Sequence, residues 1–454
     1  MARSRLVKAI GSRLRPSCWA PQAGMASQLR SRRGTPILNL RASLFKVTGK
    51  RVNKGWWLLK VRGVTEDQNQ RLGTFAETSA SGERVRAYVP RPLPPNPPLD
   101  LPQLMSVYER ATTAVGRLDS VATILPSTPL FLYMYVRKEA LLSSQIEGTQ
   151  SSLSDLLLYE NDEPPTVELD DVTEVSNYVA AIEHGVERLR GGFPLSLRLI
   201  REMHEIILRS GRGATKQPGE FRRSQNWIGG TRPGNALFVP PPPNHLDECL
   251  AAFERFLHSD KADLSPLIRA GLAHVQFETI HPFLDGNGRL GRLLITLILV
   301  EARVLREPIL YLSLFLKSRR DDYYRLLQEV RQAGAWEAWM EFFLTGVAET
   351  AEQAFETARD LLAMFEAHRE QIETLGRSAP SALRVHEFMQ ARPMVTIQTL
   401  AGAINTSFPT ASSALEKLAD LKIVRETTGK QRDRVYVYSD YLALLERGTE
   451  PLSR

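Results

Sequence analysis

Twelve residues carry most of the reactive side chains of this sequence: HPFLDGNGRLGR, from His281 to Arg292. They include one histidine, one acid, three glycines, one asparagine and two arginines. Apolar runs flank them on both sides, AGLAHVQFETI before and LLITLILVEARVL after. Because such runs are usually buried, we expect the polar segment to lie at the edge of a hydrophobic core.

The second half of this segment has the composition of a phosphate-binding helix start. A helix that begins within DGNGRLGR leaves its first backbone N–H groups unpaired, and these donors form an anion site at the positive end of the helix dipole. Glycines at positions 286, 288 and 291 let a phosphate approach the backbone closely. Arg289 and Arg292 lie three residues apart, so both project from one helix face, where two guanidinium groups suit a polyphosphate.

Two other side chains of the segment supply reactivity. Asp285 is its only acid, and one carboxylate beside phosphates commonly holds Mg²⁺, which keeps most of its waters. His281 is the only side chain here that can take up a proton near neutral pH. Although a glycine-rich turn before an apolar helix can be a turn alone, this combination suits attack by a hydroxyl on a nucleotide phosphate.

The segment resembles the signature of the Fic family, H-x-F-x-[D/E]-G-N-G-R-x-x-R, and matches every fixed position. The resemblance extends over roughly residues 85–440 and includes RKEALLSSQIEGTQSSLSDLL, residues 137–157, which is similar to the N-terminal segment of long Fic proteins. It implies a mainly α fold: a Fic-type helical bundle with a small β-hairpin flap. Here a C-terminal winged helix-turn-helix is expected to follow.

The resemblance also implies an activity, the transfer of AMP from ATP to a Tyr, Thr or Ser hydroxyl of a target protein. Carried over to this sequence, His281 is the general base, Asp285 holds Mg²⁺ or Mn²⁺, and Phe283 is a core anchor. The resemblance implies that the nucleotide is bound by the residues that follow, which are Gly286, Asn287, Gly288, Arg289, Leu290, Gly291 and Arg292. Among these, Arg289 would contact the β-phosphate and Arg292 the γ-phosphate.

A second motif of the family predicts that the site is restrained. SSQIEGT fits the inhibitory pattern [S/T]-x-x-x-E-[G/N] with Ser143, Glu147 and Gly148. A glutamate that reaches Arg292 would pair with it and occupy the place of the γ-phosphate, so that ATP would bind with its α-phosphate misoriented. The alternative is a solvated glutamate at the end of an amphipathic helix.

The resemblance indicates further contacts with the target and the adenine. PGEFRRSQNWIGG lies where the family carries its target-docking flap, to which Gly219, Phe221 and Arg222 would contribute. A tyrosine after the core helix contacts the adenine in relatives, and of the pair Tyr323 and Tyr324 we favour Tyr324.

Two histidines lie on apolar helices outside the motif, His204 and His274. Both are expected to be packed core residues. No spacing of His, Cys and acids suggests a zinc site, and the two cysteines of the chain cannot form a disulfide framework.

The net charge of +7 belongs to one end of the chain. Residues 1–65 carry 15 Lys and Arg and no acid, whereas the remainder carries 43 basic and 51 acidic residues. Basicity is therefore no argument for nucleic-acid binding by the whole protein. We expect residues 1–84 to be a basic, disordered tail; an organellar transit peptide and an over-long reading frame with a later start at Met25 are alternatives.

The remaining elements are expected to position the motif. Helical periodicity runs from about Leu101 to Phe365, interrupted by loops at 159–171 and 210–244, the second with a small hairpin. Three short helices and two strands around Gly429 then follow the winged-helix pattern. The predicted divisions are an N-terminal helical segment with the inhibitory motif at 85–175, a catalytic domain at 176–375 and a winged-helix domain at 376–454.

Several alternatives remain open at this point. The winged helix could bind DNA through Arg432 or Arg434, although its recognition helix PTASSALEKLADL has one lysine and two acids, so protein interaction or dimerisation is favoured. The same site could also remove AMP from a target. Self-modification and a homodimer are compatible with the sequence. The longest apolar stretch, Leu293 to Val300, is far short of the roughly 20 residues of a membrane span, so we expect a cytoplasmic protein without membrane contact.

Overall fold

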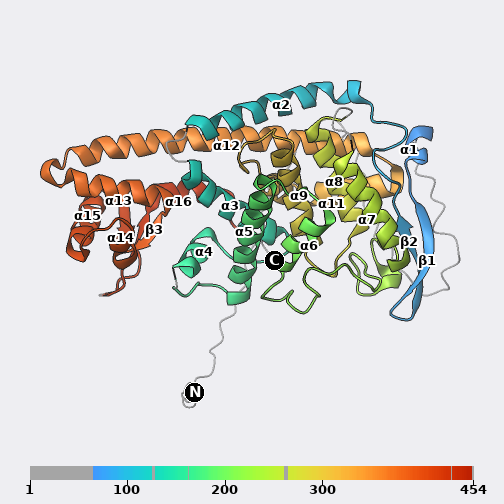
Figure 1. Ribbon diagram of the computed structural model, residues 1–454, viewed down its shortest axis with the longest axis horizontal. Coiled ribbons are helices and arrows are strands. Elements are labelled where there is room, and N and C mark those ends of the chain that lie inside the picture. The colour runs from blue at the N-terminus through green and yellow to red at the C-terminus, as the bar shows by residue number, and fades with distance from the viewer. Residues whose placement is uncertain (1–64, 125–127, 162, 260–263, 431, 452–454) are drawn as a thin grey trace, which may run out of the picture. The chain divides into compact units, whose positions relative to one another are not determined.

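The computed structural model of the protein describes residues 65–124, 128–161, 163–259, 264–430 and 432–451. These residues are mainly α-helical, with two small antiparallel sheets, which confirms the predicted fold class (Figure 1). The described residues belong to one compact unit. Within the described part of the chain, no helix has the length and apolarity needed to cross a membrane.

The predicted tail is too long, because its last part is ordered. Helix α1 (Glu66–Gln70) is followed by strands β1 (Thr74–Ala80) and β2 (Glu83–Val89), which pair antiparallel with Thr74 opposite Val89. The turn between the strands uses Ser81 and Gly82 at φ of 49° and 81°, the left-handed conformation of a tight hairpin. Residues 1–64 of the predicted tail lie outside the described residues.

The helical body confirms the expected periodicity. Its elements are α2 (Leu101–Ile124), α3 (Thr128–Ile146), α4 (Leu153–Glu160), α5 (Leu169–Arg190), α6 (Leu197–Ile207), α7 (Pro243–His258), α8 (Pro266–Ile280), α9 (Asn287–Glu301), α10 (Ser313–Ser318), α11 (Arg320–Ala333) and α12 (Trp336–Glu373). The long helix α12 packs along α2, and α8 packs against α9 (Figure 1). Nearly every residue of α8 and α9 is buried, so this pair forms the centre of the core and presents the loop between them.

The 210–244 segment is a loop, as predicted, but its hairpin is reduced to one bridge. Ile228 and Phe238 exchange both backbone hydrogen bonds, and a short 3₁₀ turn at Pro233–Asn235 lies between them. The run of prolines at 240–243 explains why pairing stops, since proline has no N–H to donate to a ladder.

The C-terminal region has the predicted winged-helix order with additions. It contains α13 (Ala379–Ala391), β3 (Met394–Thr396), α14 (Ile397–Ala403), α15 (Phe408–Asp420), β4 (Val424–Glu426), β5 (Val435–Tyr438) and α16 (Ser439–Glu446). The strand order is β3-β5-β4, and Gly429 has a positive φ in the predicted turn. Strand β3 and helix α16 were not predicted, because three and eight residues are too short to show a period.

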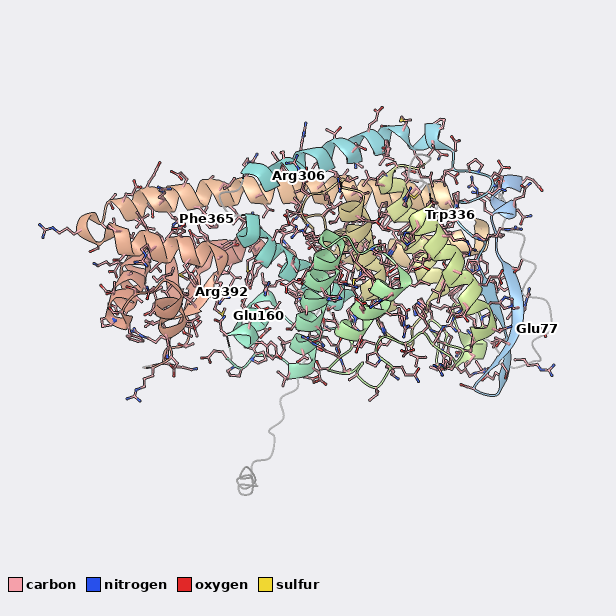
Figure 2. The ribbon with its side chains drawn as sticks, viewed as in Figure 1. Glu77, Glu160, Arg306, Trp336, Phe365 and Arg392 are labelled. Atoms are coloured by element: carbon pink, nitrogen blue, oxygen red, sulfur yellow. The ribbon has the colours of Figure 1, made fainter. Side chains whose placement is uncertain are left out.

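Aromatic packing connects this region to the end of the long helix. Figure 2 marks Trp336 at the start of α12 and Phe365 near its end. The Phe365 ring contacts Tyr438 and Tyr441 with centroids 5.8 Å and 5.3 Å apart. The divisions at 175 and 375 remain predictions from sequence. Position 175 falls inside α5, and α12 and α13, on either side of position 375, pack together.

Candidate active site

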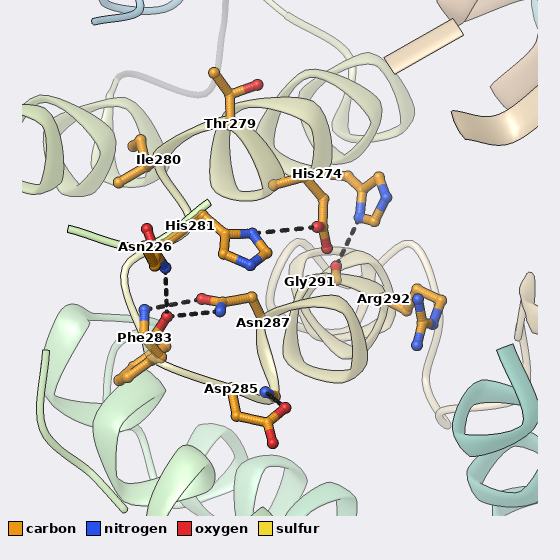
Figure 3. Close-up of polar contacts among 12 residues, drawn as sticks. Asn226, His274, Thr279, Ile280, His281, Phe283, Asp285, Asn287, Gly291 and Arg292 are labelled. Atoms are coloured by element: carbon orange, nitrogen blue, oxygen red, sulfur yellow. Dashed lines mark hydrogen bonds and ion pairs between the residues drawn. The ribbon is translucent and has the colours of Figure 1, made fainter. Parts of the chain in front are cut away.

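The loop between α8 and α9 has the backbone that its glycines predict. His281 ends α8 in the left-handed conformation at φ 49° and ψ 61°, and Gly286, at φ 75°, precedes the first residue of α9 without a side-chain cap. Helix α9 thus begins inside DGNGRLGR, as expected, and no side chain caps its first N–H groups. Figure 3 shows the polar contacts that hold this turn.

Asn287 shapes the loop rather than facing a ligand with its side chain. Its Oδ1 accepts a hydrogen bond from the Phe283 N–H and its Nδ2 donates to the Phe283 carbonyl, both at 2.9 Å. Asn226 donates to the same carbonyl at 3.0 Å. Asn287 is 2 % exposed and its side-chain amide is already paired, so its predicted contact with the nucleotide stays a prediction that its backbone N–H at the start of α9 is placed to serve.

Arg222 lies beneath the site. It is 2 % exposed, and its guanidinium donates to the carbonyls of His281 at 2.9 Å and Pro241 at 2.6 Å. Phe221 is half-buried against Phe283, and Gly219 donates its N–H to His204. The docking role of Arg222 stays a prediction that this burial does not favour, whereas Leu237 in the same loop is 77 % exposed.

His204 is a packed core residue, as expected, but it also holds the loop. Its Nδ1 accepts the Gly219 N–H at 2.8 Å, so the proton must be on Nε2, which donates to the Asp285 carbonyl at 3.0 Å. Its ring stacks on Phe283 with centroids 3.7 Å apart. Burial lowers the pKa of His204 to about 4 and keeps it neutral.

His281 is neutral and reaches the surface of the site. Its side chain is 20 % exposed. Burial, together with the cations of Arg331 and Arg222, lowers the pKa of His281 to about 3, while Glu147 and the Glu278 carbonyl act in the opposite direction. An imidazole in this state can accept a proton at neutral pH.

Asp285 presents a carboxylate beside the start of α9. Its side chain is 44 % exposed, and its Oδ1 accepts the Gly286 N–H at 2.6 Å and lies 3.7 Å from Arg289. No group of three or more His, Cys, Asp or Glu among the described residues could hold a metal by itself. A single accessible carboxylate at a phosphate site nevertheless fits Mg²⁺, which takes its other ligands from water and phosphate oxygens.

Arg289 is buried between two acids. Its Nη1 lies 3.1 Å from Glu174 Oε2, and the residue is 4 % exposed. Arg212 pairs with the same glutamate at 2.7 Å. Glu174 is on α5, more than a hundred residues away, and nothing in its local sequence distinguishes it from a surface glutamate.

Arg292 is held by the two residues of the inhibitory motif. It donates to Ser143 Oγ and to the Ser143 carbonyl at 2.9 Å each, and to Glu147 Oε1 at 2.7 Å. Burial acts to lower the pKa of Arg292, but the Glu147 carboxylate together with Tyr323, Tyr324 and Tyr178 raises this pKa overall. Correspondingly, burial acts to raise the pKa of Glu147, but Arg292 lowers it below its ordinary value. The pair is therefore fully charged at neutral pH.

Gly288 makes room for this carboxylate. A Cβ at position 288 would overlap Glu147 Oε1. The Glu147 carboxylate thus lies against the first turn of α9, where an anion is favoured. The Glu147 carboxylate therefore lies at the helix start where the sequence predicts a phosphate.

The end of α3 that bears Glu147 is fixed by distant segments. Gln145 is buried, and its Nε2 donates to the Thr449 carbonyl at 2.8 Å, while its Oε1 accepts from Lys317 at 2.7 Å. Lys317 also donates to the Glu450 carbonyl, and Lys138 to the Arg447 carbonyl at 3.0 Å. We refer to residues 446–450 as the C-terminal strap.

The remaining predicted residues divide between ligand-facing and core positions. Tyr323 is 1 % exposed, and its hydroxyl bonds His274, which in turn bonds the Gly291 carbonyl. Tyr324 is 40 % exposed, so only it is free to meet a ligand. Leu290 is fully buried, and its N–H is bonded to the Gly286 carbonyl. Its contact with the nucleotide stays a prediction that this burial does not favour.

Two family models match the regions that form this site. Residues 105–187 match the model described as Fic/DOC family N-terminal, and residues 194–299 match the one described as Fic/DOC family. The first match includes Glu147, and the second includes the whole segment 281–292.

Curated proteins that are similar to this chain are named as adenylyltransferases. A protein named "Protein adenylyltransferase Fic" from Drosophila grimshawi is 33 % identical over 161 residues, which is 35 % of this chain and 30 % of that protein. The protein of the same name from Drosophila mojavensis is 36 % identical over 135 residues, 30 % of this chain and 24 % of that protein. The chain thus spans less than a third of these curated relatives.

Solved structures of Fic proteins are similar at lower identity. A Fic family protein from Desulfovibrio desulfuricans G20 is 19 % identical, with a TM-score of 0.47 and 73 % of this chain and 96 % of that chain covered. Fic-1 (aa134 - 508) from C. elegans is 23 % identical, with a TM-score of 0.45 and 57 % and 73 % covered.

Proposed function

Because residues 105–187 and 194–299 match the two Fic/DOC family models, we propose that the chain is a protein adenylyltransferase of this family held in check by Glu147. One observation carries the proposal: a neutral histidine, an accessible carboxylate and two buried arginines converge on the open start of α9. The curated relatives named adenylyltransferases support the same reaction.

In this reaction a target hydroxyl attacks the α-phosphorus of ATP. A new P–O bond forms to the target oxygen, the bond to the β-phosphate bridging oxygen breaks, and pyrophosphate leaves with the electron pair. His281 accepts the proton of the hydroxyl on its exposed Nε2. The first N–H groups of α9 and the guanidinium groups of Arg289 and Arg292 stabilise the negative charge on the phosphates.

Asp285 is the residue that would hold Mg²⁺ or Mn²⁺ beside the phosphates. The ion supplies charge neutralisation when bound. Asp285 is suited to the task because its carboxylate is half-exposed and its backbone is fixed by His204. Tyr324 remains our proposed adenine contact, on the strength of its exposure.

Glu147 restrains the reaction by competing with the γ-phosphate for Arg292. Both groups are anions, and the Arg292 donors are shared among Ser143 and Glu147. ATP seated without this contact has its α-phosphate displaced from the line of attack. The proposed resting state is therefore autoinhibited.

DNA binding is the less favoured role for the winged helix. Lys430 of the wing pairs with Glu163 at 2.8 Å, and Arg434 lies 3.8 Å from Glu416. These cations are thus partly neutralised by acids of the same chain, which weakens any attraction to phosphates.

The test uses ATP labelled at either end. The protein and its Glu147→Gly variant are incubated with Mg²⁺ and α-labelled or γ-labelled ATP, and modified residues are mapped by mass spectrometry on the protein itself and on added target proteins. We expect α-label on a Tyr, Thr or Ser hydroxyl and no γ-label. Transfer of the γ-label instead would make the protein a kinase and overturn the proposal.

A further inference from the structure

The last turn of α8 places a buried carboxylate behind the histidine. Glu278 precedes His281 by three residues, so the two side chains lie on the same face of the helix end. Glu278 Oε2 lies 4.0 Å from His281 Nδ1, and the two side chains are 8 % and 20 % exposed. In Figure 3 this contact is the dashed line that leaves the His281 ring.

Each of these two side chains has one buried polar atom without a hydrogen bond, His281 Nδ1 and Glu278 Oε1. Oε2 is the carboxylate oxygen nearer the ring, and the Glu278 backbone carbonyl also acts on the ring. A buried polar atom without a partner is costly, so such atoms in a native protein call for an explanation. Catalytic hydrogen bonds are often long before substrate binds, so a separation of 4.0 Å is compatible with a contact that closes during the reaction.

The surrounding sequence is built to admit this carboxylate. A Cβ at position 291 would overlap Glu278 Oε1, so Gly291 is needed to leave space for it. Arg331 donates to the Glu278 carbonyl at 3.0 Å and to Thr279 Oγ1 at 3.1 Å, which fixes the backbone of the turn. The position of the carboxylate is thus set from two neighbouring helices, α9 and α11.

From this geometry we infer that Glu278 is a positioning residue for the proposed transfer, which holds Nδ1–H of His281 toward itself and leaves Nε2 free as the base. When Nε2 takes the target's proton, the ring becomes a cation with Nδ1–H facing the Glu278 carboxylate. The proton stays on the ring, and Glu278 balances its charge. The expected change in transfer rate rests on the proposed function, whereas the expected tautomer of the His281 ring does not.

The charges around the pair explain why such a partner is needed. The ring is surrounded by cations, and the arginines oppose its protonation. Burial raises the pKa of Glu278 to about 7, with Arg292 acting to lower it and Glu147 to raise it. The titratable and charged groups that face the pair are Glu147, Arg222, Arg292, Tyr323, Tyr324 and Arg331.

The transfer rate should depend on pH through the ionisation of Glu278. Glu278 has to be ionised to balance the ring, and it ionises as pH rises through about 7. The transfer rate should therefore rise with pH while Glu278 is present, in a window displaced below 7 in a Glu147→Gly background because Glu147 acts to raise this pKa. It should be flat when Glu278 is replaced by glutamine.

Two variants separate charge from hydrogen-bond acceptance, both made in the Glu147→Gly background. Glu278→Gln keeps shape and acceptor but removes charge; we expect the rate to fall about ten- to a hundredfold with ATP affinity unchanged. Glu278→Leu removes both. The His281 ring is observed by ¹⁵N NMR and is assigned as the signal that His281→Ala lacks. In Glu278→Leu this signal should change from that of a single Nδ1–H tautomer to that of a mixture of tautomers. Glu341→Gln, an exposed position on α12, is the matched control.

The outcomes are distinguishable from failure of the proposed function, because the tautomer is measured without substrate. A Glu278→Gln variant with the parent rate and the parent rise with pH would overturn the inference, as would a ring in Glu278→Leu that keeps its single tautomer. If Glu278→Leu does not fold, the rate and pH profile of Glu278→Gln decide. If ATP affinity falls together with the rate, Glu278 supports phosphate binding and the inference is also wrong.

Discussion

The phosphate loop and the inhibitory segment meet at Arg292, but they are built in different ways. The loop, residues 281–292, carries its reactive side chains in one contiguous run and is shaped in part by local contacts such as Asn287 with the backbone of Phe283, although Arg222, Asn226 and His204 also hold its backbone. The inhibitory segment, residues 143–150, is held by α10 and by the C-terminal strap, from more than 150 residues away. Chemistry is thus encoded locally in this chain, whereas its restraint depends on distant contacts, which a partner could alter without touching the loop.

The largest expected change in transfer rate comes from a substitution in the phosphate loop. His281→Ala should abolish transfer and leave ATP binding largely intact, because the imidazole acts on the hydroxyl while amides and arginines bind the phosphates. Loss of a general base typically costs about 10²–10⁴-fold. Single-turnover transfer of α-label, with calorimetry for ATP affinity, checks both parts; full activity in the variant would remove His281 from the mechanism.

Asp285→Ala should cost on the order of 10²-fold and remove the dependence on divalent metal, because one carboxylate is the accessible ligand here. The measurement is the transfer rate as a function of Mg²⁺ concentration. Strong stimulation by Mg²⁺ in the variant would place the ion elsewhere.

Removal of the inhibitory glutamate should raise the transfer rate instead of lowering it. Glu147→Gly should raise the rate roughly ten- to a hundredfold, since a charge-assisted hydrogen bond contributes about 1.5–3 kcal/mol and about 1.4 kcal/mol corresponds to tenfold. ADP lacks the γ-phosphate, so its affinity should hardly change. Adding Arg292→Ala should reverse the gain, and a gain that survives this change would show that Glu147 acts by another route.

The smallest effect should come from the strap. A chain that ends at Glu446 loses the carbonyl acceptors of Gln145, Lys317 and Lys138. Each hydrogen bond contributes about 1 kcal/mol, so we expect a rise of roughly three- to tenfold. In the Glu147→Gly background the truncation should add nothing. Lys430→Ala, which breaks the wing's ion pair with Glu163, is the matched control and should leave the rate unchanged.

The contrast also explains what could be predicted from the sequence. The loop could be interpreted because its reactive residues are contiguous, and the choice of Tyr324 over Tyr323 is compatible with their burial. The burial of Arg222 was not foreseen, because a buried arginine that bonds backbone carbonyls has the same local sequence as an exposed one. Glu174, Asn226 and the strap were missed because their partners are brought to them only by the tertiary fold.

One measurement tests the central claim most directly: the initial rate of α-label transfer from ATP in the wild type, Glu147→Gly, and Glu147→Gly with His281→Ala. The account predicts a low rate in the first, a rate at least tenfold higher in the second, and a rate near background in the third. Equal rates in the first two proteins would contradict the restraint by Glu147. Label that persists in the third would contradict the site itself.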